Sequence, residues 1–406
     1  MYKQFIKIIF CLIVTKSVLY SGGFQLNEHG AKALAQSGAF AARANDPSAM
    51  YFNPAGIAHL DGTRLVLGTT LIFPDISFKP DLPWSSMMYP PEYKVSKQTF
   101  TPFNLHFTHK INDMFTAGLS VYNPYGLGTK WPKNWVGKSL SIMAEIQLFN
   151  FNPTIAARFL DDKLSIGAGF NYTIGSVEML RMVAYPITLH LKAGLTDGVG
   201  YGYNVGLQYK VTPSFIIGAS YRSSMDVEIE GNATLSMYDP TIPQGKVKST
   251  LKLPANIFLA TACSPIDNLW LEFDAQFIGW SSFDKLEMIF ENYNNYANTI
   301  EKNYKDTWIF RFGAEYKLSE YLTLSGGFFR DLNPVPDETL DPMLPDSDRW
   351  GINLGVSYQV TKMLSVDLTY VFLPFDERTT NVQKDHFNGT YNITTNLFGF
   401  NINFNF

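Results

Sequence analysis

Along most of the chain, apolar side chains alternate with polar or small ones at a period of two residues. The pattern begins near Leu65 and is clearest in residues 164–173, where Leu, Ile, Ala, Phe and Tyr alternate with Ser, Gly, Gly, Asn and Thr. Residues 200–209, 269–277 and 352–358 repeat it. Because successive side chains of a β-strand point to opposite faces, this period predicts strands with one apolar face and one polar or small face.

The alternation fits two kinds of all-β protein. A soluble sandwich buries its apolar faces against each other, whereas a membrane barrel turns them outward to lipid and keeps polar groups in its lumen. In residues 269–277 the second face carries Glu272, Asp274 and Gln276, which need water or polar partners. The alternation by itself does not separate the two folds.

The lengths of the connections separate them. Six short polar turns are predicted, at residues 109–113, 160–163, 210–214, 264–268, 317–321 and 359–363. Seven longer connections, rich in proline or polar residues, lie between them near residues 74–100, 124–141, 179–199, 222–253, 279–307, 331–350 and 373–395. Short periplasmic turns and long external loops are typical of outer-membrane barrels. Seven long loops imply seven hairpins, so the sequence predicts an antiparallel transmembrane β-barrel of about fourteen strands with both termini in the periplasm.

The last segment of the chain carries a second indication of a barrel. Phe398, Phe400, Ile402 and Phe404 alternate with Gly and Asn, and the chain ends on Phe406. A terminal alternating strand that ends in Phe resembles the signal by which outer-membrane proteins engage the barrel-assembly machinery, which we therefore expect as a partner. The alternative, an edge strand of a soluble sheet, would leave an apolar edge prone to aggregation.

The composition and the start of the chain support export to a lipid environment. Charged residues make up 17% of the chain, against roughly 25% in ordinary soluble domains. Lys3 and Lys7 precede the apolar run 8–14, and small residues occupy 21–23, the order of a secretory signal peptide, which we place at residues 1–21. The rest of the chain has no run of 18 apolar residues, so a membrane protein with this sequence must be a barrel.

Residues 22–63 precede the barrel, which we place at residues 64–406, and they lack the period of two. The pairs Asp46-Pro47 and Asn53-Pro54, the second followed by Ala55, each place a capping side chain before a proline at a first helical position. Two short helical turns are therefore predicted. A compact segment ahead of a barrel with periplasmic termini fits a hatch that plugs the lumen; the alternative is a periplasmic tail.

Short motifs occur along the chain at Gly23–Glu28, Asp46–Ala49 with Asn53–Gly56, Pro124–Thr129, Gly279–Phe283, and Pro334–Asp337 with Leu344–Arg349. Together they resemble the FadL/TodX family of outer-membrane transporters for long-chain fatty acids and other hydrophobic compounds, including aromatic hydrocarbons. They span nearly the whole chain and occur in the family's order. The resemblance implies a fourteen-stranded barrel with an N-terminal hatch, a groove on the outer loops, a pocket inside the barrel and a sideways exit through a gap made by a kink in the third strand.

We expect the third strand to run from near Met114 to Asn123. Pro124 cannot donate to a β-ladder, and Gly126 and Gly128 tolerate unusual backbone angles. These three residues are therefore the candidates for a lateral opening at strand three. The alternative is that the strand simply ends there and a loop begins.

The candidate ligand-binding residues are apolar side chains of the long loops and one cation. Met and aromatic side chains form an adaptable apolar surface, and the loop candidates are Phe78, Trp84, Met87, Tyr125, Trp131 and Trp135. Their alternative role is a membrane-interface girdle or loop packing. Phe24 is added by resemblance, as the family's residue that inserts toward the pocket. Arg158 is a candidate partner for a fatty-acid carboxylate, although it could instead pair with a lumen acid such as Glu145.

Together these features predict passive uptake of hydrophobic molecules across the bacterial outer membrane, with long-chain fatty acids as the leading cargo. Import of aromatic hydrocarbons and a general diffusion porin are the alternatives. We expect no enzyme, since the six histidines are scattered and no Gly-x-Ser-x-Gly motif occurs. We also expect no cofactor and no metal site. A nucleic-acid partner is not expected either, because without the three lysines of residues 1–21 the formal charge is −7. The barrel is expected to be a monomer in contact with outer-membrane lipid.

Overall fold

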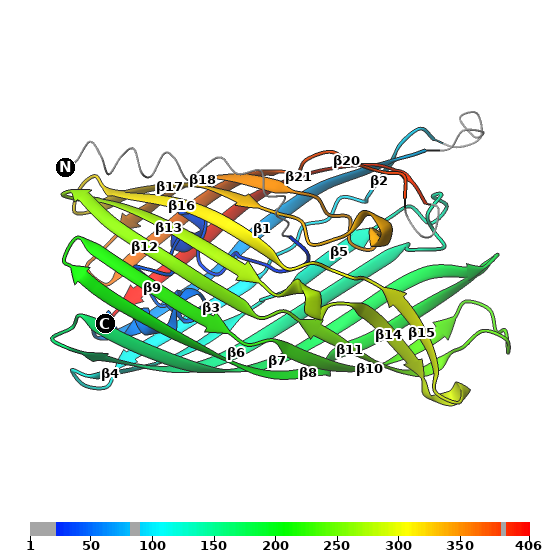
Figure 1. Cartoon of the computed structure of the whole chain (residues 1–406), viewed down its shortest axis with the longest axis horizontal. Coiled ribbons are helices and arrows are strands. Elements are labelled where there is room, and N and C mark those ends of the chain that lie inside the picture. Colours follow the sequence, from blue (N-terminus) through cyan, green and yellow to red (C-terminus); the bar gives the residue numbers. More distant parts are fainter. Residues whose placement is uncertain (1–21, 82–89, 383–386) are drawn as a thin grey trace.

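The structure is a computed structural model and describes residues 22–81, 90–382 and 387–406. The predicted signal peptide lies outside the described residues, and so do Trp84 and Met87. The chain forms a closed antiparallel barrel of fourteen strands, as the sequence predicts. Figure 1 shows the strands tilted along the long axis, with the C-terminus at one end and β2, β14, β15 and β20 toward the other.

Several of the fourteen wall strands consist of two consecutive segments separated by an irregularity. In chain order they are β1 (Thr63–Pro80), β3 (Phe103–Lys110), β4 with β5 (Phe115–Tyr122, Gly126–Lys130), β6 (Met143–Phe159), β7 (Leu164–Ala184), β8 (Ile187–Thr212), β9 with β10 (Phe215–Arg222, Met225–Leu235), β11 with β12 (Gly245–Leu253, Asn256–Ile266), β13 with β14 (Leu269–Ile278, Lys285–Phe290), β15 with β16 (Tyr296–Glu301, Thr307–Lys317), β17 (Leu322–Asp331), β18 (Arg349–Gln359), β19 (Leu364–Pro374) and β21 (Gly389–Asn405). The short strands β2 (Tyr93–Lys94) and β20 (Arg378–Thr380) pair with β1 and β21. Pairing of β1 with β21, from Arg64 opposite Asn405 to Pro80 opposite Gly389, closes the barrel.

The predicted two faces of the strands are confirmed. Phe170 and Tyr201 lie on the outer surface with 51% and 62% of their area exposed, whereas Asn171 and Asn204 on the same two strands are buried inside. Glu272 and Asp274 of β13 are also buried. The apolar face therefore points to lipid and the polar face lines the lumen, as a membrane barrel requires.

In three of the seven predicted long connections much of the chain is β-strand, and the prediction was wrong there. β7 and β8 run through residues 179–199 and are joined by Tyr185 and Pro186 alone. Residues 222–253 contain β10 and β11, and residues 279–307 contain β14 and β15. In β10 the alternation persists with its polarity reversed, because Val227 and Ile229 are buried inside while Glu228 is exposed. This end of the barrel has a polar exterior and an apolar interior, so its strands do not resemble membrane-spanning strands.

Residues 22–62 lie inside the barrel, at the end where the short turns are (Figure 1). They form α2 (Ala31–Ala35), α3 (Ala49–Phe52) and the 3₁₀ helix η1 (Pro54–His59). The Asn53 side chain accepts a hydrogen bond from the Ala55 N–H with Pro54 at the first helical position, as predicted. α2 was not predicted, and α3 begins two residues after Pro47. The alternative of a periplasmic tail is excluded. That the segment blocks passage, as a hatch does, stays a prediction.

The helices of the structure are short. Among the described residues, none is long and apolar enough to cross a membrane.

The orientation of the wall strands predicts how they respond to a charged substitution. Leu354 is the central residue of the eleven-residue strand β18 and has 60% of its area exposed. We expect Leu354→Arg to lower the free energy of unfolding by about 2–4 kcal/mol, because a cation near the bilayer midplane must be desolvated. Equilibrium unfolding in urea with phospholipid vesicles measures this change. Tyr238→Arg, in the connection between β10 and β11, is the matched control and should change stability little.

Candidate ligand-binding site

The ladder between the second and third wall strands is interrupted near residues 123–125. β4 pairs with β3 as far as Tyr122 opposite Asn104, and β5 then continues the third strand from Gly126. Pro124 has no N–H to donate, so the ladder cannot run through it unbroken. The backbone here bonds to the N-terminal segment instead: the Leu26 N–H donates to the Pro124 carbonyl at 3.0 Å, and the Gly126 N–H to the Phe24 carbonyl at 3.0 Å. Gln25 thus forms an isolated antiparallel β-bridge with Tyr125 at the break.

One aromatic ring covers the interrupted part of the wall. The Phe100 N–H and carbonyl pair with Ile72 of β1, and its ring crosses to Gly128 of β5. A Cβ atom on Gly128 would lie 2.2 Å from two atoms of that ring. The absence of a side chain at Gly128 is therefore required for this contact. The interruption is covered by Phe100 on one side and by residues 24–26 on the other.

Phe24, near the start of the N-terminal segment, is the centre of an aromatic cluster. Its ring centroid lies 5.6 Å from Tyr125, 5.1 Å from Trp280 and 5.5 Å from Phe283, distances at which tilted and edge-on rings attract one another. Only 3% of Phe24 is exposed. The cluster joins the N-terminal segment to the third strand and to residues 280–283, which follow β13.

A carboxylate holds the residue before Phe24. The Gly23 N–H donates to Asp346 Oδ2 at 2.6 Å. Gly23 has φ +73°, and a side chain there would also collide with the Trp280 ring, so only glycine suits this position. Burial raises the pKa of Asp346 to about 6, against the lowering effect of Arg349 and of the Gly23 hydrogen bond. At pH 7 the carboxylate is therefore mostly ionised and accepts a charge-assisted hydrogen bond.

Phe24 lies between two cavities. The first, which we call the apolar cavity, has a volume of about 60 Å³ and lies among the reversed-polarity strands. Its walls include Val177, Leu191, Ile229, Val247, Leu251, Phe283, Met288 and Tyr304. Among the described residues, Lys302 is the one cation on its wall, and its ammonium group is ion-paired with Asp341. The apolar cavity therefore suits an uncharged group.

The second cavity, which we call the mixed cavity, has a volume of about 240 Å³ and reaches the interrupted wall. Phe100, Gly126 and Gly128 line it there. Elsewhere its wall has an apolar part (Ile72, Ile76, Val371, Leu373, Ile393, Leu397) and a polar part (Asn27, Glu28, Arg311, Asp331, Arg349, Asn353). Phe24, Glu145, Ile146 and Leu344 line both cavities. The two cavities are thus neighbours that share a wall.

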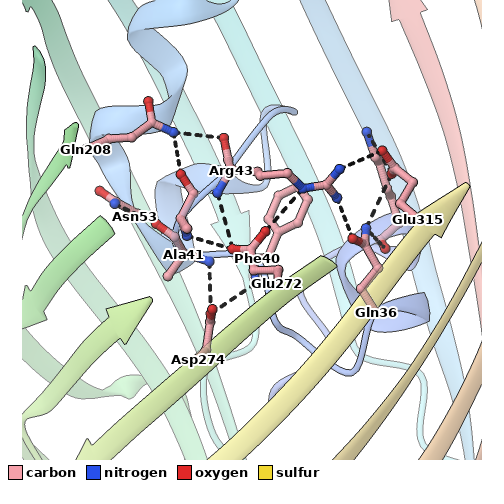
Figure 2. Close-up of polar contacts among 11 residues, drawn as sticks. Gln36, Phe40, Ala41, Arg43, Asn53, Gln208, Glu272, Asp274 and Glu315 are labelled. Carbon is pink, nitrogen blue, oxygen red and sulfur yellow. Dashed lines mark hydrogen bonds and ion pairs between the residues drawn. The ribbon is translucent and has the colours of Figure 1, made fainter. Parts of the chain in front are cut away.

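The N-terminal segment is held to the lumen wall by carboxylates (Figure 2). Asp274 Oδ2 accepts from the N–H groups of Phe40 and Ala41, at 3.0 and 2.9 Å. Glu272 Oε1 accepts from the N–H groups of Ala42 and Arg43, at 2.7 and 3.2 Å. The chain is not helical here, so these four buried N–H groups need side-chain partners, and the lumen face of β13 supplies them.

Arg43 extends this network to a second strand. Its guanidinium forms ion pairs with Glu272 at 3.2 Å and with Glu315 of β16 at 2.9 Å, and donates to Gln36 (Figure 2). On the opposite wall, Gln208 Nε2 donates to the carbonyls of Ala42 and Arg43. The segment is therefore bound through its backbone on several sides, which opposes its displacement from the lumen.

The predicted site residues are distributed over different parts of the barrel. Phe24, Tyr125, Gly126 and Gly128 line the mixed cavity, and Pro124 lies beside them. Asp46, Pro47, Asn53, Pro54 and Ala55 shape the N-terminal segment and line neither cavity.

The remaining predicted side chains are Phe78, Trp131, Trp135 and Arg158. The rings of Trp131 and Trp135 stack with their centroids 4.2 Å apart, and the Phe78 ring lies edge-on to Trp135 with a centroid distance of 6.1 Å. These three residues are buried in the same hydrophobic core cluster as Phe24, but they line neither cavity. Arg158 lies near a short turn, paired with Asp162 at 3.2 Å, and it also lines neither. The structure therefore does not bring these four side chains into contact with the two cavities.

The sequence analysis missed several lining residues, among them Phe283, Met288 and Tyr304. Two signals for them were present. Phe283 lies in a motif that resembles the family, and the buried residues of β10 and β11 keep a period of two with reversed polarity. Met288 and Tyr304 lie in segments that were interpreted as loop.

Comparisons with known proteins agree on one family. A family model described as "Outer membrane protein transport protein (OMPP1/FadL/TodX)" matches residues 12–406. The long-chain fatty acid transport protein of Escherichia coli (strain K12) is 26% identical over 412 residues, which cover 90% of each chain. Outer membrane protein P1 of Haemophilus influenzae is 27% identical over 349 residues, which cover 76% of this chain and 75% of that one.

Two solved structures show the same fold. A Pseudomonas aeruginosa FadL homologue matches with a TM-score of 0.82 and 21% identity, over 95% of this chain and all of that chain. The P. putida toluene transporter TodX matches with a TM-score of 0.74 and 17% identity, over 94% of this chain and 99% of that chain. The barrel architecture is therefore shared.

The carboxylate network around Arg43 predicts what happens when that cation is removed. Arg43→Met leaves Glu272 and Glu315 without this partner, which should destabilise the packing of the N-terminal segment by about 3–5 kcal/mol, because a buried charge loses its pair. We expect higher conductance in planar bilayers and faster proteolysis within residues 22–62. Lys192→Met, which removes an exposed partner of Glu178, is the control. Unchanged conductance and proteolysis in the Arg43 variant would show that the network does not hold the segment.

Proposed function

Because this chain belongs to the outer membrane protein transport protein (OMPP1/FadL/TodX) family, we propose that it takes up hydrophobic molecules, above all long-chain fatty acids, by passive diffusion across the outer membrane. The family consists of outer-membrane transporters, not enzymes. We propose the division of the chain into a signal peptide (residues 1–21), a hatch (22–63) and a barrel (64–406). We also propose that the barrel is a monomer and that Phe406 engages the assembly machinery.

The position of Phe24 between the two cavities is the observation that carries the proposal. A molecule that fills only the apolar cavity needs to be no longer than one ring, whereas a long acyl chain can extend past Phe24 into the mixed cavity. The apolar cavity supplies contacts for hydrocarbon, and the mixed cavity adds a polar wall. An elongated molecule with one polar end matches this combination. The fatty-acid transport protein of E. coli, which is 26% identical, supports the same class of cargo.

Aromatic hydrocarbons are the second candidate cargo. The wall of the apolar cavity offers almost only apolar side chains, and rings from Phe24, Phe283 and Tyr304 face it. Such walls accept a small uncharged ring without any polar contact. The fold is shared with a protein described as a toluene transporter, although at 17% identity this supports only the architecture.

The proposed route leaves the barrel sideways. The carboxylate network holds the N-terminal segment across the lumen (Figure 2), which opposes a straight passage of the kind a general diffusion porin has. The mixed cavity reaches the interrupted ladder at Phe100, Gly126 and Gly128. We propose that the cargo enters from the loop side, passes Phe24 and exits to lipid between the second and third strands. Trp84 and Met87 remain proposed ligand contacts.

Binding measurements separate the two cargo classes. Ile229, which is 6% exposed, lines the apolar cavity. We expect Ile229→Glu to weaken binding of both oleate and toluene at least tenfold, because an acidic group in an apolar wall must be desolvated. Titration calorimetry with purified protein measures both ligands. Thr234→Glu, an exposed position on the same strand, is the control.

Titration of the unsubstituted protein with oleate and with toluene distinguishes the two cargo classes. Oleate binding tighter than toluene binding supports the fatty-acid proposal, and the reverse order supports the aromatic alternative. A large ohmic conductance without binding of either ligand would instead support a porin.

A further inference from the structure

Several buried polar atoms around the mixed cavity lack hydrogen-bond partners. They are Ser37 Oγ, Arg311 Nε, Asp331 Oδ1 and Asn353 Oδ1, and no partner for any of them occurs among the described residues. All four residues line the mixed cavity, and each is at most 2% exposed. Leaving a buried donor or acceptor unsatisfied is costly, so such a group indicates a partner that is not part of the chain.

The other polar atoms of these side chains are fixed. Asp331 Oδ2 accepts from Arg349 Nη2 at 2.6 Å. Arg311 donates through Nη2 to Gln276 at 2.6 Å and through Nη1 to the Ser37 carbonyl at 3.2 Å. Asn353 Nδ2 donates to the Leu34 carbonyl of α2 at 2.5 Å. The unsatisfied atoms of Arg311, Asp331 and Asn353 therefore cannot rotate toward partners within the protein without breaking these contacts.

The strand register explains why this polar group adjoins an apolar wall. Asn353 of β18 is opposite Val371 of β19, which is opposite Leu397 of β21, which is opposite Ile72 of β1. All four side chains line the mixed cavity. Ile72 pairs in turn with Phe100. One row of lumen-facing residues thus leads from a polar end at Asn353, along apolar side chains, to the ring that covers the interrupted wall.

We infer that the polar end of the mixed cavity is a head-group site for a long-chain molecule whose neutral head both donates and accepts hydrogen bonds, such as an alcohol or an un-ionised carboxylic acid. The head accepts from Arg311 Nε and donates to Asn353 Oδ1. Its chain lies along Val371, Leu397 and Ile72. The apolar end of the molecule then faces Phe100 and the lateral exit.

The charges of the cavity favour a neutral head over an anion. Four carboxylates line the cavity, from Glu28, Glu145, Asp331 and Asp346, against the two guanidinium groups of Arg311 and Arg349. The guanidinium of Arg349 is already paired with Asp331. A bound carboxylate would therefore be repelled by the net negative charge of the cavity wall. A hydroxyl group adds no charge and can satisfy both an unpaired donor and an unpaired acceptor of that wall.

This inference rests on the proposed uptake of hydrophobic molecules and adds the polar end of the cargo to it. It is tested with four ligands of equal chain length: hexadecanol, hexadecanoic acid, 1-methoxyhexadecane and hexadecane. The methyl ether accepts a hydrogen bond but cannot donate one. We expect hexadecanol to bind about tenfold more tightly than the ether, because one buried acceptor stays unsatisfied with the ether. Titration calorimetry of the purified full-length barrel measures each ligand.

Two asparagines provide a matched pair of variants. Asn353 and Asn401 are both buried, and each bonds to the backbone of α2, at Leu34 and Ala31 respectively. Asn401 does not line the mixed cavity. Asn353→Leu should reduce the preference for alcohol over ether to less than about threefold, whereas Asn401→Leu should retain it. If Asn353→Leu does not fold, Ser37→Gly removes another unsatisfied group at a position whose φ of +61° suits glycine.

The outcomes separate this inference from the proposed function. Equal binding of the alcohol, the ether and hexadecane would overturn the head-group site and leave uptake of hydrophobic molecules intact. An equal loss of preference in the Asn353 and Asn401 variants would also overturn it, because the effect would then come from the packing of α2. Failure of all four ligands to bind would instead contradict the proposed function. Tighter binding of hexadecanoic acid than of the ether supports the site for acids as well as alcohols.

Discussion

The structure depends on one requirement: backbone N–H and C=O groups removed from water must find partners within the protein. In the wall this requirement produces a closed ladder, completed by β1 and β21. Where Pro124 interrupts the ladder, residues 24–26 supply hydrogen bonds in its place. Inside the lumen the same requirement is met by side chains, since Glu272 and Asp274 together accept from four successive N–H groups of the N-terminal segment. This requirement therefore explains why the barrel is closed, why residues 24–26 bond to the chain beside Pro124, and how the N-terminal segment is held in the lumen.

The polarity of the strands divides the barrel into two parts with different interiors. At the end where the short turns lie, the exterior is apolar and the lumen polar, which suits a membrane outside and a hydrogen-bonded segment inside. In β10 and β11 the arrangement is reversed, with Val227, Ile229 and Val247 buried inside. Phe24 lies where the two interiors meet, and the two cavities adjoin there. The cavities are therefore a consequence of the reversal and are not features of the loops alone.

The candidate site was predicted only in part. Phe24, Tyr125, Gly126 and Gly128 were identified from the sequence, since a family motif and the backbone properties of proline and glycine are local features. The side chains that face them were not, because Met288 and Asn353 reach the cavities through strand register and Tyr304 through the connection between β15 and β16. Trp131 and Trp135 were proposed from their composition alone, and they pack against each other. An aromatic side chain in a loop has the same sequence pattern whether it lines a cavity or stabilises a loop.

The sequence by itself determined the fold class, the number of strands and the face of each strand that meets lipid. These properties depend on a period of two residues and on turn lengths, which are local, and a single-chain barrel has few ways to arrange fourteen strands. Only the tertiary structure decided where the strands continue with reversed polarity, which residues meet at Phe24, and that Asn353 and Ile72 lie in one row across β18, β19, β21 and β1. The physical reason is register: hydrogen bonds between strands far apart in the chain fix which side chains share a level of the lumen.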